Sequence, residues 1–231
     1  MADDPLSEAR LIRGQAVSGL VFATFLLLHL LNAAAGALGP EFYDGFLARV
    51  RLVYQFPLFE IFAVGTAALV HASYGVRRAL VRRRRARAGR KAPVPGWLRV
   101  HRLSGWFLLV VLPGHALATR GPGLFLDLPA DFSFLRFSLE TWPWFMVPYY
   151  ALLYTAGVYH LLHGGMIALS IAGLPAPAPT GRAARALLFV ALLAGGTAVA
   201  SMAGASGPAD TSRYGAFRAL YEDYAPFMVN W

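Results

Sequence analysis

Cysteine is absent from this chain of 231 residues. Its absence excludes disulfide bonds, thiolate metal sites, an iron–sulfur cluster held by this chain and a thioether-linked haem. Charged residues are also scarce, since they make up 14% of the sequence against roughly 25% in an ordinary soluble domain. Hydrophobic residues make up 57%. That share excludes disorder, and it is more than a soluble enzyme of this size is expected to bury.

Acidic residues are few, because 12 Asp and Glu stand against 21 Lys and Arg, for a formal charge of +9. An excess of this kind occurs in nucleic-acid-binding proteins. Here, however, eleven of the basic residues fall between Arg77 and Arg102, a stretch that contains no acid. Such clustering in one segment is typical of a membrane protein, and we expect no nucleic-acid partner.

Long apolar runs are what the sequence has instead. A helix needs about 20 apolar residues to cross a bilayer core, and five segments approach that length: 15–38, 57–76, 103–119, 144–174 and 183–203. They predict an all-α integral membrane protein with five transmembrane helices, the first four forming a bundle. We expect a membrane domain over 1–205 and an extramembrane tail over 206–231. Nothing near the N-terminus has the pattern of a cleaved signal peptide.

The basic stretch predicts the orientation. The positive-inside rule places the loop 77–102 in the cytoplasm, so the N-terminus is expected in the cytoplasm and the C-terminus outside. The loops 39–56 and 120–143 then lie outside. The arginines either set topology alone or also dock an acidic partner or anionic lipid.

The tail carries an aromatic stripe at helical spacing, made of Tyr214, Phe217, Leu220, Tyr221 and Tyr224. This pattern predicts an amphipathic helix that lies in the outer membrane interface, with binding of a partner as the alternative.

Five of the six histidines fall inside predicted spans, and His101 lies at a span boundary. Ionisable residues in hydrocarbon are costly and therefore indicate function. A weak internal repeat relates four of the five. Ser18 and Gly19 precede His29 as Ser104 and Gly105 precede His115, with eleven residues from serine to histidine in both. Eleven residues return to nearly the same helix face, about 16 Å along the axis.

The second half of the repeat is a histidine followed four residues later by glycine, at His71 and again at His160. Depth along the spans pairs His29 with His115 at the outer level and His71 with His160 at the inner level. Two facing imidazoles suit six-coordinate haem iron in a helix bundle. One alternative is that the histidines serve helix packing. Another is a zinc site, although structural zinc requires four ligands at one level.

Small and polar residues near these histidines fit the same interpretation. Gly19 and Gly105 lie at the inner level, where they either admit a flat macrocycle or serve helix packing. The repeat favours His160 over its neighbour His163 as the ligand, which leaves His163 to bond a propionate, a carbonyl or water. His101 and Arg102 are either a propionate clamp or solvated residues at the interface.

The ordered set of Ser-Gly…His and His-x-x-x-Gly motifs, repeated once, resembles the di-haem cytochrome b membrane anchors of succinate:quinone oxidoreductases, a family that includes the fumarate reductases. The resemblance covers roughly residues 10–205. It implies two haem b groups, the outer held by His29 and His115 and the inner by His71 and His160. Some members carry a glutamate, linked to transmembrane proton movement, two positions before the fourth ligand. Here that position is Val158, so the resemblance does not imply this route.

The resemblance also implies partners and a location. It implies an iron–sulfur subunit and a flavoprotein on the cytoplasmic side, quinone as substrate, and the bacterial cytoplasmic (inner) membrane. The chain is then an electron-transfer subunit rather than a catalyst alone. Quinone needs hydrogen-bond donors and a proton path. The candidates, which are alternatively ordinary solvated residues, are Glu41, Asp44, Arg51, Tyr54, Gln55 and Glu60 outside, and Arg13, Gln15, Ser18 and Arg102 inside.

Two other functions fit the same pattern. One is a di-haem cytochrome of another redox complex, such as a hydrogenase, a formate dehydrogenase or the partner of a periplasmic carrier. The other is not redox at all: a membrane anchor or transporter with a histidine proton relay.

Overall fold

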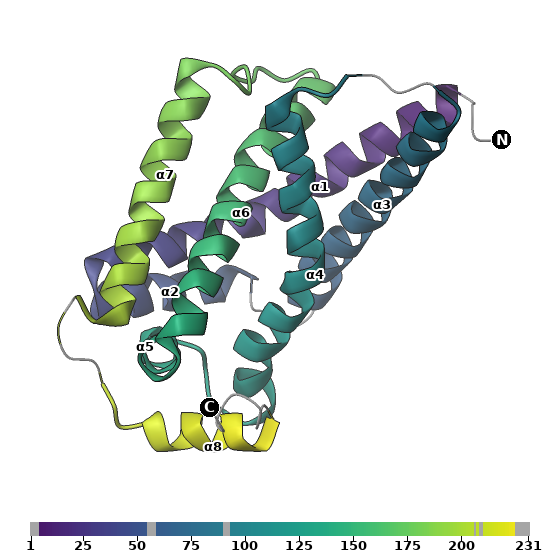
Figure 1. Cartoon of the computed structure of the whole chain (residues 1–231). Coiled ribbons are helices and arrows are strands. Elements are labelled where there is room, and N and C mark those ends of the chain that lie inside the picture. Colours follow the sequence, from purple (N-terminus) through teal and green to yellow (C-terminus); the bar gives the residue numbers. More distant parts are fainter. Residues whose placement is uncertain (1–4, 55–58, 90–92, 206, 208–209, 225–231) are drawn as a thin grey trace. The chain divides into compact units, whose positions relative to one another are not determined.

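The computed structural model describes residues 5–54, 59–89, 93–205, 207 and 210–224. Most of these residues are helical and none of them is in a strand, which confirms the all-α prediction. Figure 1 shows the elements, which in chain order are α1 (Pro5–Ala35), η1 (Gly36–Leu38), α2 (Pro40–Tyr54), η2 (Phe59–Gly65), α3 (Thr66–Arg87), α4 (Gly96–Phe125), α5 (Phe132–Thr141), α6 (Pro143–Ile171), α7 (Arg182–Ala200), η3 (Ser201–Ala205) and α8 (Tyr214–Tyr224).

Three helical stretches are long and apolar enough to cross a membrane, namely Glu8–Leu38, Pro143–Ile171 and Arg182–Ala205. They coincide with the first, fourth and fifth predicted spans. The described part of the second predicted span, 59–76, is also helical within η2 and α3, and the third lies within α4. Those helices are less apolar, because α3 passes into arginines after Val76 and α4 carries Pro113 and His115 in its apolar stretch.

The segments between the predicted spans are largely helical, which was not predicted from the sequence. α2 occupies most of 39–56, α5 lies within 120–143, and α3 continues through the basic segment to Arg87. Arginine and alanine are strong helix formers, so the basic run extends a helix instead of ending it. α5 begins at a capping residue, Asp131, whose side chain accepts a hydrogen bond from the Phe134 amide. This contact satisfies one of the free amides at the helix start.

The chain divides into two compact units. Unit 1 comprises residues 1–30, 50–107 and 156–190, and unit 2 comprises residues 31–49, 108–155 and 191–231. In unit 1, α1 and α3 lie close together: a Cβ on Gly14 would stand 2.6 Å from the Tyr74 ring. An ion pair of 2.7 Å between Glu8 and Arg85 joins the same two helices.

Unit 2 has an aromatic core between α5 and α8, the helix that follows α7 at the lower edge of Figure 1. Phe217 of α8 has no exposed surface. Its ring lies 5.3 Å from Phe134 and 5.7 Å from Phe137 of α5. Tyr221 lies 4.5 Å from Trp142, which follows α5.

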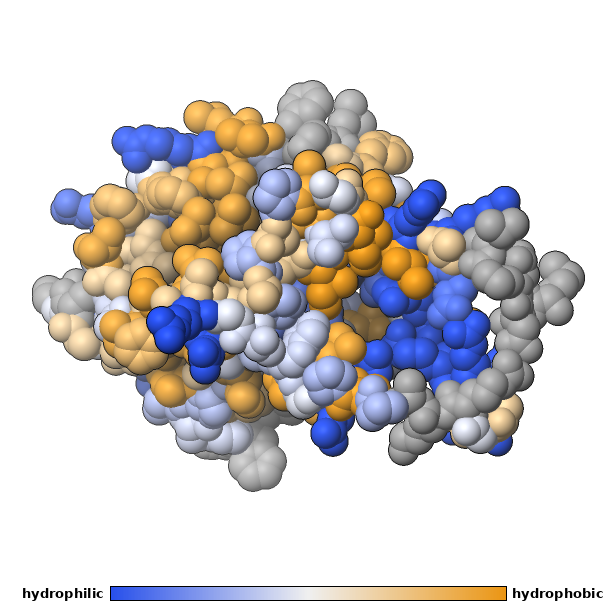
Figure 2. Space-filling model, turned by 90° about the horizontal axis from the view of Figure 1, so that it is seen from above, coloured by the Kyte–Doolittle hydropathy of each residue, from blue (hydrophilic) through white to orange (hydrophobic). Residues whose placement is uncertain are grey.

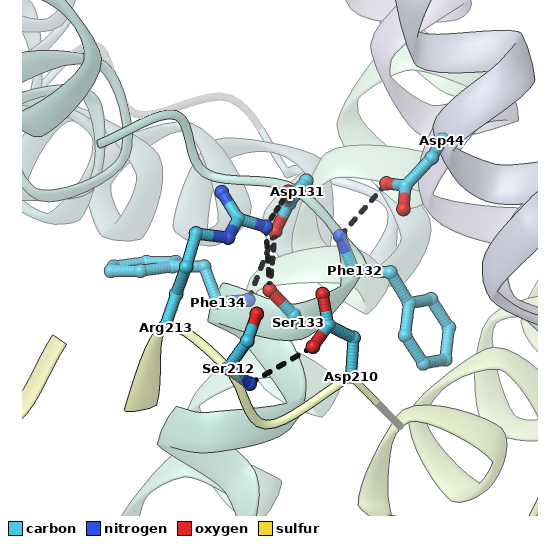
Figure 3. A network of polar contacts seen from close by, with 8 residues as sticks. All are labelled: Asp44, Asp131, Phe132, Ser133, Phe134, Asp210, Ser212 and Arg213. Carbon is cyan, nitrogen blue, oxygen red and sulfur yellow. Dashed lines mark hydrogen bonds and ion pairs between the residues drawn. The ribbon is translucent and has the colours of Figure 1, made fainter. Parts of the chain in front are cut away.

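Polar contacts hold the start of α8 to the start of α5 (Figure 3). Arg213 forms an ion pair with Asp131 and donates a hydrogen bond of 2.8 Å to Ser133. On the other side, the Phe132 amide donates to Asp44 of α2 at 2.9 Å. α5 is therefore tied to both α2 and α8 within unit 2.

The predicted helix of the aromatic tail stripe is present, and its position at the outer membrane interface stays a prediction. The stripe packs on α5, and only Tyr224 of the stripe is strongly exposed. Tyr214 donates a hydrogen bond of 2.9 Å to Glu140 at the end of α5. Burial and this carboxylate raise the pKa of Tyr214 to about 12.

Large apolar side chains are exposed on the long helices, for example Leu69 on α3, Val110 on α4 and Phe189 on α7. Figure 2 shows extended hydrophobic areas on one face of the molecule. Hydrophilic residues gather mainly on the right of that view, where Figure 1 places the C-terminal end of α3. Exposed apolar area on this scale is typical of surfaces that face lipid or protein.

Candidate functional site

Two histidines from distant parts of the sequence face each other in unit 1. The imidazole rings of His71 on α3 and His160 on α6 have centroids 6.1 Å apart, and their planes are almost perpendicular, at 84°. These are the two residues that the repeat predicts as the inner pair. Both rings are partly buried.

The first half of the site joins α1 and α3. The Nδ1 atom of His71 lies 3.0 Å from the main-chain oxygen of Gln15. A carbonyl only accepts, so Nδ1 carries the proton and Nε2 keeps its lone pair. A Cβ on Gly19 would stand 2.8 Å from His71 Nδ1, and one on Gly75 would stand 3.1 Å from the side-chain nitrogen of Gln15. The glycines are therefore required for the close approach of these two helices.

The second half repeats this arrangement between α4 and α6. His160 Nδ1 lies 3.3 Å from the main-chain oxygen of His101 and 3.3 Å from the Ser104 hydroxyl. That hydroxyl donates to the same His101 oxygen at 2.9 Å, so it accepts from Nδ1. A Cβ on Gly105 would stand 2.9 Å from His160 Cε1, and one on Gly164 would stand 3.0 Å from His101 Cε1.

The weak repeat in the sequence thus corresponds to two sets of equivalent contacts around His71 and His160. In each half, a ring nitrogen points to the carbonyl four residues before a glycine, and that glycine contacts the ring. Gly19 and Gly105 were expected either to admit a macrocycle or to serve helix packing, and the structure places imidazole rings against both of them. Contacts of this kind hold a ligand histidine in one tautomer and one orientation.

His101 is the third imidazole of the site. Its ring stacks on His160, with centroids 4.4 Å apart and planes at 13°. His101 lies four residues before Gly105, as Gln15 lies four residues before Gly19, so it is the residue of the second half that corresponds to Gln15. Its Nδ1 atom is buried and has no hydrogen-bond partner. A buried polar atom of this kind is uncommon and calls for a ligand group or water.

His163 has a different environment and is buried, with 5% of its surface exposed. Its ring stacks on Tyr159 at 4.0 Å and on Trp97 at 5.9 Å. Its Nδ1 lies 3.1 Å from the Tyr159 main-chain oxygen, and the Tyr159 hydroxyl donates to the Trp97 oxygen at 3.1 Å. His163 therefore packs α6 against the start of α4, and it is His160 that faces His71.

One arginine of the basic segment, Arg78, contacts the site. Arg78 donates a hydrogen bond of 2.6 Å to the side-chain oxygen of Gln15. Burial and the nearby Arg102 guanidinium lower the pKa of Arg78, and the same causes lower the pKa of Arg82 to about 10.

The predicted outer pair is divided between the units. His29 belongs to unit 1, where its ring stacks on Phe25 with centroids 5.7 Å apart. His115 belongs to unit 2, and its Nδ1 lies 3.2 Å from the Tyr149 hydroxyl. The pairing of His29 with His115 stays a prediction.

The quinone candidates come from several helices. Asp44 caps the start of α5, and the Tyr54 ring lies edge-on at 4.9 Å from Phe25. Gln55 lies outside the described residues. Ser18 bonds the main-chain oxygen of Gly14 at 2.7 Å. The remaining candidates lie on their helices as follows: Arg13 and Gln15 on α1, Glu41 and Arg51 on α2, Glu60 on η2 and Arg102 on α4.

Sequence reasoning missed Arg78 and Tyr149. Arg78 follows His71 by seven residues, two helical turns along the same face, and this spacing was the available signal. No pattern in the sequence pointed to Tyr149. A metal site of three or more His, Asp or Glu side chains does not occur among the residues that the structure describes, so zinc gains no support.

Comparison of the chain with family models, with curated proteins and with solved structures finds no match. The site geometry therefore carries the functional argument.

Proposed function

We propose that this chain is a di-haem b-type cytochrome, a membrane subunit that passes electrons between the quinone pool and a cytoplasmic iron–sulfur partner of succinate dehydrogenase or fumarate reductase type. The observation that carries the proposal is the pair His71 and His160, with rings 6.1 Å apart and both Nδ1 atoms directed to main-chain oxygens. Each ring then offers Nε2 to a metal.

The ring spacing fits a single iron atom. An imidazole nitrogen binds a metal at about 2 Å, and the ring centre lies roughly 1 Å behind that nitrogen, so two ligands on opposite sides of one metal have centroids about 6 Å apart. Haem iron with two histidine ligands has this arrangement, and it needs no further protein ligand. The unpartnered Nδ1 of His101 and the neighbouring Arg102 would supply donors for the carboxylates of the same group.

The residues of this chain then have defined roles. The haem, when bound, supplies reversible one-electron transfer. The main-chain oxygens of Gln15 and His101 hold the two rings in the ligating tautomer, and Gly19 and Gly105 let the helices come close enough to do so. Because the ligands lie on helices of the scaffold, their geometry is rigid, which suits electron transfer with little rearrangement.

The proposal extends to a second, outer haem held by His29 and His115. It is supported by the repeat, which gives both residues the same spacing from Ser-Gly, and by the Tyr149 hydroxyl that stands at His115 Nδ1 as a carbonyl stands at His71. Two haems at two depths provide a route across the bilayer. The proposed topology has five spans in a bacterial cytoplasmic membrane, with the arginine-rich end of α3 on the cytoplasmic side, where an iron–sulfur subunit and its flavoprotein dock.

Purification of the complex with its partners tests this function. We expect a low-spin b-type spectrum on reduction, two haems per chain, and a flavoprotein and an iron–sulfur protein that co-purify. Two haems with a hydrogenase, a formate dehydrogenase or a periplasmic carrier as partner would replace the succinate and fumarate assignment. A chain that binds no haem in a properly inserted state would favour the histidine relay and overturn the proposal.

A further inference from the structure

We infer that the exposed face of α3 binds an anionic phospholipid, whose acyl chain lies along Leu69 and Val70 and whose phosphate lies at Arg77 and Arg84. It rests on the membrane topology proposed above and not on haem binding. The sequence alone allows either an acidic protein partner or an anionic lipid for these arginines. The surroundings of the exposed face favour the lipid.

The basic residues belong mainly to unit 1. Unit 1 contains 16 Lys and Arg residues but only four Asp and Glu, whereas unit 2 contains five basic and eight acidic residues. No acidic residue occurs between Glu60 and Asp127 in the sequence. Unit 1 therefore has an excess of positive charge that its own residues cannot neutralise, and a surface of this kind attracts anions.

The arginines of α3 lie on two faces with different surroundings. Arg78 and Arg85 bond residues of α1, the first by a hydrogen bond and the second by an ion pair. Arg77 and Arg84 are exposed, and neither has a carboxylate partner among the residues that the structure describes. They are seven residues apart, which is two turns on one side of the helix. The charge of this face is thus available to a ligand from outside the chain.

The same face of α3 is apolar on the N-terminal side of Arg77. Leu69 is 71% exposed, Val70 is exposed as well, and both precede Arg77 by about two turns. Leu80, which is 50% exposed, lies between the two arginines. One face therefore carries an apolar half followed by a cationic half. An anionic phospholipid has the same order of parts, an apolar chain followed by a phosphate.

The apolar half distinguishes the lipid from other ligands. A soluble acidic protein would cover Arg77 and Arg84 but would leave Leu69 and Val70 exposed to water. A zwitterionic lipid would cover the apolar half but would bring no net charge to the arginines. An anionic phospholipid satisfies both halves of the face with one molecule.

The direction of α3 adds to the fit. Long side chains on a helix lean toward its N-terminus. In the proposed topology α3 runs toward the cytoplasm, so Arg77 and Arg84 are expected to lean back toward the apolar half, where a lipid phosphate lies. α1 runs the opposite way, and its exposed Arg10 and Arg13 are expected to lean away from the exposed Val17 into water. α1 therefore offers matched arginines in an unfavourable direction.

The test measures the binding of single lipids to the full-length chain in a neutral detergent. Phosphatidylglycerol and phosphatidylcholine, each labelled on one acyl chain, are titrated with protein, and fluorescence anisotropy gives the dissociation constants. Each arginine near a membrane surface adds about fivefold to the affinity for an anionic lipid. We expect phosphatidylglycerol to bind at least about tenfold more tightly than phosphatidylcholine.

Two double variants of equal charge locate the site. Arg77→Gln combined with Arg84→Gln should lose most of the preference for phosphatidylglycerol. Arg10→Gln combined with Arg13→Gln removes the same charge from exposed positions of α1 and should keep the preference. Equal losses in the two double variants would mean that the general charge of unit 1, and not the α3 face, attracts the lipid.

Salt provides a measurement on the wild type alone. The preference should fall severalfold between about 0.01 M and 1 M NaCl, because the Debye length falls from about 30 Å to about 3 Å. The inference is overturned by a wild type without preference, by a preference that salt does not change, or by an unchanged preference in the α3 double variant. If that variant keeps the preference but loses a co-purifying iron–sulfur protein, the face binds protein.

Haem content of the same samples separates this inference from the proposed function. Two haems per chain without a lipid preference overturn the lipid site and leave the proposed function standing. A lipid preference in a chain that binds no haem has the reverse meaning, because the α3 face does not include the ligand histidines.

Discussion

The Nδ1 atom of His71 lies 3.0 Å from the main-chain oxygen of Gln15. Because the acceptor belongs to the backbone, no side-chain substitution at position 15 removes it. The orientation of the imidazole depends instead on how closely α3 approaches α1, and Gly19 sets that distance. His160 depends in the same way on the backbone at His101 and on Gly105.

The glycines are therefore the sensitive positions. In Gly19→Ala or Gly105→Ala, the added methyl group would stand under 3 Å from the ligand ring, so the ring must move and we expect loss of about one haem per chain. Overpacking of this kind typically costs about 1–3 kcal/mol. Haem content per chain and the low-spin spectrum measure the effect.

Gly165→Ala is the matched control. Gly165 lies on the same helix as His160, and a Cβ added at this position would have no neighbouring atom within 4 Å. It is expected to keep both haems. If Gly19→Ala and Gly105→Ala also keep both haems with unchanged spectra, the proposed packing of the ligand rings is wrong.

Phe217, which is completely buried, is predicted to hold α8 against α5. Phe217→Ala should cost about 3–5 kcal/mol, as for other buried phenylalanines, and should release α8 from α5. Limited trypsin digestion measures this release, because the bond after Arg218 becomes accessible. Tyr224→Ala, at a strongly exposed position of the same helix, should leave the cleavage rate unchanged. Equal cleavage of both variants would contradict the packing.

Tyr214 should give this contact a pH dependence. Burial and the Glu140 carboxylate raise its pKa to about 12, whereas the unfolded value is about 10. A pKa raised on folding means that the stabilisation is complete below pH 10 and is lost as the pH rises from about 10 through 12. The digestion rate of wild-type protein should therefore rise in this range. Tyr214→Phe, which cannot ionise, should show a smaller rise, and an identical pH profile for the two proteins would contradict the assignment.

The helical class and the inner histidine pair could be predicted from the sequence because both depend on local spacing. A helix brings residues eleven apart to one face, and a repeated motif brings equivalent residues to equivalent contacts, so His71 and His160 followed from the pattern. The role of His163 was open in the sequence, and only its stacking on Tyr159 and Trp97 separates it from His160.

Other features depend on tertiary contacts that no local pattern specifies. The helices α2 and α5 lie in connections between predicted spans and were not predicted, since short amphipathic helices are stabilised chiefly by what they pack against. The tail stripe was read correctly as a helix, but its partner α5 lies about 80 residues earlier in the chain. In the sequence, Arg78 is one of many arginines in the basic segment, and only its hydrogen bond to Gln15 in the structure distinguishes it.

The central claim is that His71 and His160 ligate one haem iron through their Nε2 atoms. The most direct measurement is haem content per chain, with the low-spin spectrum, in His71→Ala and His160→Ala, beside His163→Phe as a variant that keeps an aromatic ring between Tyr159 and Trp97. We predict that each alanine variant loses one of two haems and that His163→Phe keeps both. Two haems with an unchanged spectrum in either alanine variant would contradict the claim.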